Sequence, residues 1–348
     1  MRIVVNDIAA STGGAMTVLR DFYKCVCQND KENQWFFLLA DRYFEETDNV
    51  KIIAMPQIKK SGLRKLIFDH VTGRWFINKL KPDVVLSLQN IITFGVKAPQ
   101  AVYIHQSIPF QDVKRFSFFR KAERQTAVIQ HVIGRIIKRS VKKSNLVMTQ
   151  TQWIKDAMCQ KCHIAPQKVL VVTPAVLEKN VPAGEFDSTA FFYPTSNQLY
   201  KNNTCLMQAA ALLKADGVEH KVTMTLPAEM SDGTVECIGR ITYEQVLAHY
   251  STSTLVFPSY IETFGYPLAE ARRAGAIVLA SNCPFSHEVL EGYENAYYFD
   301  PFKPTQLKEL MKQVVTGEII KKPVEAPAET ASDSWLTVVQ TVLDMRKK

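Results

Sequence analysis

The sequence predicts an α/β protein made of two doubly wound parallel sheets. Short apolar runs alternate with helical patterns along nearly all of the 348 residues. The runs are almost continuously apolar, which is typical of parallel strands covered on both faces. The pattern then restarts after Pro182, beyond the separating segment Pro174–Gly184. We therefore expect one domain over 1–178, a second over 179–333, and a separate helix over 334–348.

Each expected strand is a run rich in β-branched and aromatic residues. In the first series they are Ile3–Val5, Trp35–Leu39, Lys51–Met55, Val84–Leu88, Ala101–Ile104, Leu146–Thr149 and Val169–Thr173. In the second they are Ala190–Tyr193, Lys221–Leu226, Val235–Ile238, Leu255–Phe257, Ile277–Ala280 and Ala296–Phe299. Ligands of such sheets bind beyond the carboxyl ends of the strands, so we expect the site in a cleft between the domains.

Helical patterns lie between the strands. The clearest are Met16–Gln28, Gly62–Leu80, Ala127–Lys143, Asn203–Ala215 and Tyr243–Tyr250. At the end of the chain, Ser334–Lys348 is amphipathic, with Leu336, Val339 and Val342 on one side. This last helix could pack back on the first domain or cap the second, and its pattern favours neither.

Positive charge is concentrated in one window, Lys114–Lys143. The chain carries a net charge of +8, and this window alone holds ten Lys or Arg against one acid, Glu123. The rest of the chain is therefore close to neutral, and one surface is expected to meet an anionic partner. Val128/Ile129, Val132/Ile133, Ile136/Ile137 and Val141 form an apolar stripe in its helix, expected to face the core.

An anionic membrane is the first partner we expect for residues 114–143. Phe116, Phe118 and Phe119 are mixed with cations, as in interfacial segments. Nucleic acid is the rival partner, but no helix-turn-helix, zinc module or RNA-binding signature accompanies the charge. We therefore predict no nucleic-acid partner.

The sequence favours a cytoplasmic protein. The first strand starts at Arg2, no uncharged apolar run approaches the roughly 20 residues that span a bilayer, and the seven cysteines are an odd number. Reduced thiols fit better than a disulfide framework. Cys159–His163 matches a haem-attachment string, but that chemistry requires export, so we interpret the match as coincidence.

Two turns are candidates for binding an anion. Gly13 and Gly14 follow the first strand and open a helix, where backbone N–H groups can approach a phosphate. The spacing is neither a dinucleotide fingerprint nor a P-loop, and a plain turn is the alternative. Lys201 follows the first strand of the second domain, where its ammonium could reach a phosphate or lie in solvent.

The segment Phe257–Ala271 combines a buried strand, a loop with a carboxylate, a glycine turn and a helix. Glu262 lies in the loop, Gly265 in the turn, Pro267 near the start of the helix, and Glu270 one turn in. Two carboxylates can accept hydrogen bonds from adjacent hydroxyls of a sugar. The alternative is a capping glutamate and a solvated one.

This segment, ETFGYPLAE over 262–270, resembles the Glu-x7-Glu signature of retaining glycosyltransferases of family 4. Three more stretches of the second domain are similar to that family: YKNN at 200–203, CIGRITYEQVLAHY at 237–250 and FDP at 299–301. In the first domain the Gly13–Gly14 loop and VYIHQ at 102–106 extend the likeness. The resemblance implies the GT-B fold, with two Rossmann-like domains facing an interdomain cleft, and sugar transfer with retention of configuration.

The resemblance also implies roles for individual residues. Glu270 would hold the nucleotide ribose, Glu262 the transferred sugar and Lys201 the diphosphate. The implied sugar-nucleotide positions are Gly13, Gly14, Ser196, Lys201, Asn202, Arg240, Ile241, Glu262, Thr263, Phe264, Gly265 and Glu270. His105 would face the transferred sugar or the acceptor hydroxyl, with a structural histidine as the alternative. The implied catalytic set is Glu262, His105 and Lys201.

The sequence departs from the family at Ser196, where an arginine is common. It also lacks an Asp-x-Asp motif, so Lys201 and helix N-termini are expected to balance the diphosphate without a metal or cofactor.

We therefore expect a retaining hexosyltransferase that uses a nucleotide-diphosphate sugar. Its expected acceptor is a membrane-associated, polyprenyl-diphosphate-linked glycan in surface polysaccharide assembly, reached from the inner face of the cell membrane. The alternatives are a transferase with a soluble acceptor, or a basic membrane- or nucleic-acid-binding adaptor with a decayed transferase site.

Overall fold

The chain forms two compact units in a computed structural model. The structure describes residues 1–11, 13–176, 181–182, 184–324 and 334–346, without the side chains of 13 and 14. Unit 1 comprises residues 1–118, 124–175 and 332–348, and unit 2 comprises 119–123 and 176–331. The division near residue 175 lies three residues from the predicted boundary at 178.

In its described residues, unit 1 is built on a parallel sheet of seven strands in the order β3-β2-β1-β4-β5-β6-β7. The strands are β1 (Arg2–Asp7), β2 (Gln34–Leu39), β3 (Val50–Ala54), β4 (Val84–Ser87), β5 (Gln100–Ile104), β6 (Leu146–Thr149) and β7 (Val169–Val171). All seven were predicted, with no end displaced by more than two residues, because buried parallel strands have a strong apolar signal.

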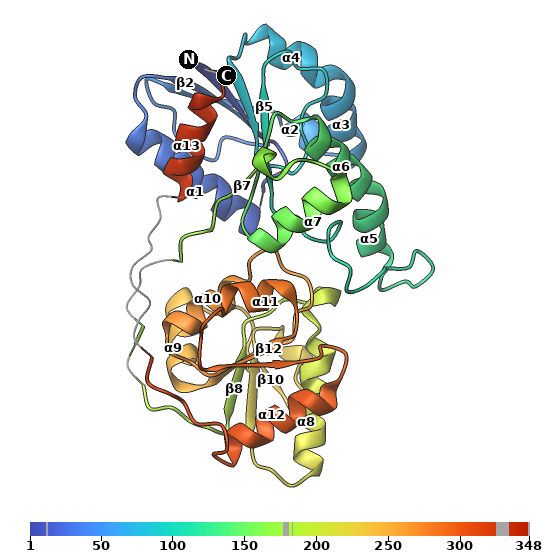
Figure 1. Cartoon of the computed structure of the whole chain (residues 1–348), viewed down its shortest axis with the longest axis vertical. Coiled ribbons are helices and arrows are strands. Elements are labelled where there is room, and N and C mark those ends of the chain that lie inside the picture. Colours follow the sequence, from blue (N-terminus) through green and yellow to red (C-terminus); the bar gives the residue numbers. More distant parts are fainter. Residues whose placement is uncertain (12, 177–180, 183, 325–333, 347–348) are drawn as a thin grey trace. The chain divides into compact units, whose positions relative to one another are not determined.

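Helices cover both faces of this sheet (Figure 1). They are α1 (Gly13–Asn29), α2 (Pro56–Lys59), α3 (Gly62–Ile67), α4 (Gly73–Lys79), α5 (Arg124–Ala127), α6 (Gly134–Lys143), α7 (Gln152–Cys162) and α13 (Ser334–Asp344). Two π-helical turns, η1 (Phe68–Thr72) and η2 (Val128–Ile133), interrupt longer helical runs, and a 3₁₀ turn, η3 (Pro166–Lys168), precedes β7. Within the described residues no helix is long and apolar enough to cross a bilayer.

The predicted core stripe of the basic helix is partly wrong. Val128 and Val132 are 38% and 47% exposed, whereas Ile137 and Val141 are buried. The difference arises at η2, because a π-helical turn bonds i to i+5 and breaks the spacing that keeps one α-helical face together.

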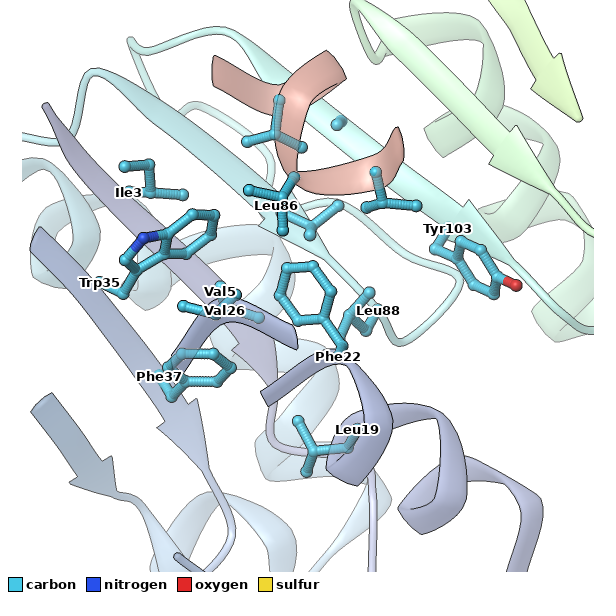
Figure 2. Packing of buried hydrophobic residues seen from close by; sticks show 14 of the residues in the cluster. Ile3, Val5, Leu19, Phe22, Val26, Trp35, Phe37, Leu86, Leu88 and Tyr103 are labelled. Atoms are coloured by element: carbon cyan, nitrogen blue, oxygen red, sulfur yellow. The ribbon is translucent and has the colours of Figure 1, made fainter. Parts of the chain in front are cut away.

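The core of unit 1 alternates across β1. Ile3 and Val5 face a cluster with α1 and α13, whereas Val4 faces a cluster with η1 and α4. Figure 2 shows the first cluster, where Phe22 of α1 packs against Trp35, their ring centroids 5.9 Å apart.

Helix α13 belongs to unit 1. Val338, Val339 and Val342 are buried in the cluster that contains β1 and α1, and Trp335 contacts Phe22 edge-on at 5.6 Å. Of the two positions that the sequence left open, the helix has the first, beside α1 (Figure 1).

The described part of unit 2 contains a parallel sheet of six strands in the order β10-β9-β8-β11-β12-β13. The strands are β8 (Ala190–Tyr193), β9 (Lys221–Met224), β10 (Glu236–Cys237), β11 (Thr254–Phe257), β12 (Val278–Ser281) and β13 (Ala296–Phe299). The helices are α8 (Asn203–Ala215), α9 (Tyr243–Thr252), α10 (Tyr266–Arg273), α11 (Pro284–Val289) and α12 (Pro304–Val315), with 3₁₀ turns η4 (Leu199–Lys201) and η5 (Ala228–Met230). The strand order reverses between β8 and β11, and doubly wound sheets bind ligands at such a point.

Candidate functional site

The loops after β8 and β11 meet at the reversal point of unit 2. These strands are hydrogen-bonded neighbours, so their carboxyl ends lie at one edge of the sheet. The Tyr260 amide donates to the Tyr200 carbonyl (3.1 Å), and the Tyr193 hydroxyl donates to the Lys201 carbonyl (2.8 Å). The first of these bonds fastens together two loops about sixty residues apart in sequence, and the second holds the Lys201 loop to β8.

Lys201 and Glu262 form an ion pair at this edge. The Lys201 Nζ lies 2.5 Å from the Glu262 Oε1, and the two side chains are only 18% and 15% exposed. The Ser259 hydroxyl donates to the same carboxylate oxygen at 2.7 Å. The sequence assigned Lys201 and Glu262 to different parts of one ligand, and the structure brings them into contact. Ser259 was missed, because a serine before a glutamate has no distinctive signal.

Asn202 has a structural role at the start of α8. It adopts the left-handed conformation with φ +57°, and its Nδ2 donates to the carbonyls of Pro258 (3.2 Å) and Pro301 (2.7 Å). Its amide thus joins three loops at the edge of the sheet. Ser196, in the loop after β8, is exposed, and its carbonyl accepts from the Asn203 Nδ2 at 2.9 Å.

The turn into α10 requires glycine. Gly265 has φ +88°, where a side chain is strained, and a Cβ there would approach the Leu268 Cδ1 at 3.3 Å. Pro267 follows in the first turn of α10, where its missing N–H has no helical partner in any case. Thr263 and Phe264 lie between Glu262 and this helix N-terminus, a position suited to an anionic ligand.

Glu270 of α10 is oriented by tyrosines of α9. The Tyr250 hydroxyl donates to its Oε2 at 3.1 Å. Burial raises the pKa of Glu270, and the hydroxyls of Tyr250 and Tyr243 partly offset that rise. Neither tyrosine was singled out in the sequence, although both lie in the stretch that resembles family 4. Arg240 and Ile241 lie between β10 and α9, just before Tyr243.

In unit 1, His105 directly follows β5 and is held by Asn90. The Asn90 Oδ1 accepts from the backbone amides of His105 (2.7 Å) and Gln106 (3.0 Å), so its Nδ2 faces the His105 Nε2 at 3.0 Å. The Nε2 therefore accepts a hydrogen bond, and the ring proton lies on Nδ1. Burial lowers the pKa of His105 to about 4, which makes the imidazole neutral at pH 7. Asn90 itself is left-handed, with φ +66°.

A charged cluster that the sequence did not predict lies near the end of β1. Asp7 is 2% exposed, and burial raises its pKa to about 7 although Lys65 and Lys59 oppose the rise. Lys65 pairs with Asp69 at 2.6 Å, and Lys59 donates to the Ala9 carbonyl.

The loop after β1 leads to α1, which begins at Gly13, so the N-terminus of α1 lies at the predicted anion-binding turn.

No three His, Cys, Asp or Glu residues lie close enough to hold a metal ion in the described ranges. The metal-independent reaction remains a prediction.

Comparison with known proteins gives matches to sugar transferases. Residues 228–331 match the family model described as glycosyl transferases group 1. Over 297 residues, 78% of each chain, the protein is 25% identical to the O-antigen chain mannosyltransferase RfbU of Salmonella typhimurium. It is also 30% identical over 141 residues to the serotype-specific mannosyltransferase WbdA of Escherichia coli, a match that spans 40% of this chain and 17% of WbdA.

Among solved structures, HepE of Anabaena, in complex with UDP-glucose, aligns with a TM-score of 0.66 at 15% identity. The alignment covers 100% of this chain and 99% of HepE. The fold is therefore GT-B, as predicted. The prediction of a glycosyltransferase is likewise confirmed, by the family model and the curated relatives.

Proposed function

We propose that this glycosyltransferase is a retaining, metal-independent enzyme of family 4. On this proposal it moves a hexose from a nucleotide-diphosphate sugar to a lipid-linked glycan in surface polysaccharide assembly. One observation carries the proposal most directly: the half-buried Lys201–Glu262 pair, joined by Ser259, at the strand reversal of unit 2. Glu270 lies on the helix that follows the same loop.

The ion pair is suited to opening when the sugar nucleotide binds. A diphosphate carries more charge than one carboxylate, so it can draw the Lys201 ammonium toward itself. Glu262 then has oxygens available for the sugar hydroxyls, while Ser259 keeps the carboxylate in place. Glu270 takes the ribose hydroxyls, and Arg240 and Ile241 lie near the base.

Transfer then proceeds on one face of the sugar. The bond between the anomeric carbon and the diphosphate oxygen breaks, and the acceptor oxygen bonds to the same carbon from the same side. The acceptor proton moves to the leaving diphosphate, which departs as the nucleoside diphosphate. Lys201 and the helix N-terminus that follows Gly265 stabilise the charge that develops on it.

His105 acts in this scheme as a hydrogen-bond donor to a sugar or acceptor hydroxyl. A neutral ring with its Nε2 engaged by Asn90 carries its proton on Nδ1. A general base would instead need an open lone pair. The assignment therefore leaves deprotonation of the acceptor to the leaving group.

The curated relatives guide the choice of sugar and acceptor. RfbU and WbdA are both named mannosyltransferases, and RfbU acts on the O-antigen chain. A nucleotide-diphosphate mannose and a polyprenyl-diphosphate-linked glycan are therefore the first pair to test. The exposed cations of 114–143, including Arg115, Lys121 and Arg139, support a peripheral position on the anionic inner face of a membrane.

Replacing Glu262 with Gln tests this proposal. The substitution keeps the shape but removes the charge that orders Lys201, so we expect transfer to fall by at least about 100-fold with the melting temperature little changed. Glu294→Gln is the matched control, because its partner Lys322 is an exposed surface lysine. Near-normal turnover by the Glu262 variant would contradict the proposed role of Glu262. Failure of UDP, GDP, ADP and dTDP species to raise the melting temperature would favour a decayed adaptor.

A further inference from the structure

The helical run α3–η1–α4, residues 62–79, carries large apolar side chains on its surface. We call this set the outer stripe. Its members are Leu63 (66% exposed), Leu66 (40%), Ile67 (43%), Val71 (44%) and Trp75 (58%). Single exposed apolar residues are ordinary, but five on one helical run form a surface that water solvates poorly.

The outer stripe faces away from the sheet. Val71 and Trp75 each precede a buried residue, Gly73 and Ile77, by two positions. Two residues turn an α-helix through about 200°, so Trp75 and Ile77 lie on opposite sides of α4. Val71, four residues before Trp75, is exposed as well. Ile77 packs in the core with β1, β2 and β4. A surface helix normally has a polar outer face, and one that is apolar on both sides is typically covered by something other than water.

The charge around the outer stripe is positive. Lys60, Arg64 and Lys79 are exposed, and the Arg74 guanidinium lies over the Trp75 ring at 4.5 Å. The acid in this run, Asp69, is buried against Lys65 at 2.6 Å. Apolar side chains rimmed by cations complement a layer of anionic headgroups above acyl chains.

The outer stripe adjoins the basic helix α6. The Phe94 ring contacts the His70 ring of η1, with centroids 4.7 Å apart and the planes tilted by 32°. The Arg139 guanidinium of α6 also lies over the Phe94 ring, 4.9 Å from its centroid. Phe94 thus joins η1 to α6, which brings the Arg139 cation close to the helical run that carries the outer stripe.

We propose that the outer stripe inserts into the interfacial layer of an anionic bilayer, with Lys60, Arg64 and Arg139 on its headgroups. Pairing with the same face of a second copy would instead bring one positive rim against another. This inference rests on the proposed function in one respect: membrane binding would give the enzyme access to a membrane-bound acceptor. Binding itself can be measured without any transfer reaction.

Flotation with vesicles is the direct test. The full chain should float with phosphatidylcholine vesicles that contain phosphatidylglycerol, and much less with phosphatidylcholine alone. Leu63→Ser or Trp75→Ser should each weaken binding about tenfold, because each removes one inserted side chain. Ile320→Ser is the matched control, since Ile320 is 69% exposed in unit 2, and it should bind as the native protein does.

Trp75 is also a probe of its own insertion. The structure describes all four tryptophans of the chain, and among them Trp75 is the exposed one. Its fluorescence should shift to the blue with anionic vesicles and be quenched by brominated lipid. Trp75→Phe should remove both changes, whereas Trp153→Phe should retain them.

Charge reversal completes the design. The double variant Lys60→Glu and Arg64→Glu should lose most binding. Lys24→Glu, which changes an exposed lysine on α1, should lose little.

Equal flotation by the Leu63, Trp75 and Ile320 variants overturns the proposal. So does a concentration-dependent dimer that Leu63→Ser abolishes. If native protein floats but transfers no sugar even to detergent-solubilised acceptor, the proposed function fails while this inference stands.

Discussion

Asp7 is a carboxyl group in an environment that disfavours its charge. Burial raises its pKa from 3.8 to about 7, and Lys65 and Lys59 only partly compensate. Between these two values the folded protein keeps a proton that the unfolded chain has released. The contribution of Asp7 to stability therefore falls as the pH rises from about 4 to about 7. His105 acts in the opposite sense, because its pKa is lowered to about 4 and folding is disfavoured as the pH falls from 6.5.

We predict that Asp7→Asn removes the first of these effects. The unfolding free energy of the variant minus that of the native protein should increase by roughly 2–4 kcal/mol as the pH rises from 4 to 8. The comparison across pH cancels any constant effect of the amide, and His105 is common to both proteins. Urea unfolding at pH 4, 6 and 8 measures the difference. A constant offset between the two proteins would contradict the raised pKa.

Asn90 is a positioning residue whose left-handed backbone marks a constrained site. Asn90→Asp places a carboxylate beside the His105 Nε2, which should raise the pKa of His105 above 4 and move the ring proton toward Nε2. We expect kcat to fall roughly tenfold, since the hydrogen bond to substrate changes direction.

The control for this prediction is Asn90→Gly, which tolerates the same backbone conformation without the amide. It should also lose activity, but the pKa of His105 should stay low. NMR titration of the histidine and the pH profile of kcat give the two readouts. If the Asp variant leaves both unchanged, Asn90 has no positioning role.

At the scale of elements, the loops of unit 2 depend on a few backbone conformations. Asn202 and Gly265 are both left-handed and both stand at a helix N-terminus, of α8 and α10. The first joins the Lys201 loop to the carbonyls of Pro258 and Pro301. These caps aim two helix N-termini at the edge where Lys201 and Glu262 meet, which suits a diphosphate.

Helix α13 shows how a distant element completes a core. Val338 is fully buried beside α1, although about 160 residues of unit 2 precede it in the chain. We predict that Val338→Asp destabilises unit 1 by roughly 3–5 kcal/mol, because it buries an unpaired charge. Thr337→Asp, one residue earlier and exposed, should cost little. Thermal unfolding of the two variants compares them, and equal melting temperatures would count against this packing.

At the scale of the whole molecule, the proposed reaction needs no metal. In this scheme Lys201 and the helix N-termini supply positive charge for the diphosphate. We predict that transfer persists in excess EDTA. If EDTA abolishes activity and magnesium restores it, the metal-independent scheme is refuted. The assignment of Glu262 is tested separately, by the Glu262 variant.

Much of this architecture could be predicted because its signals are local. The strands are short apolar runs, and Asn203–Ala215 matches α8 in both ends. Gly265 and Pro267 mark the start of α10 through their own backbone preferences. Where backbone geometry broke the regular pattern, as at η2, the expected core stripe failed at Val128 and Val132.

By itself the sequence determined the strand series, the restart of the pattern near residue 182 and the segment that holds Glu262 and Glu270, because these depend on composition and spacing. Tertiary structure alone decided the contacts between distant residues. Lys201 meets Glu262, Asn90 sets the tautomer of His105, and α13 packs on unit 1. The outer stripe too is visible only when the buried face of its helix is known. Burial and pairing depend on which segments meet in space, and no local pattern records that.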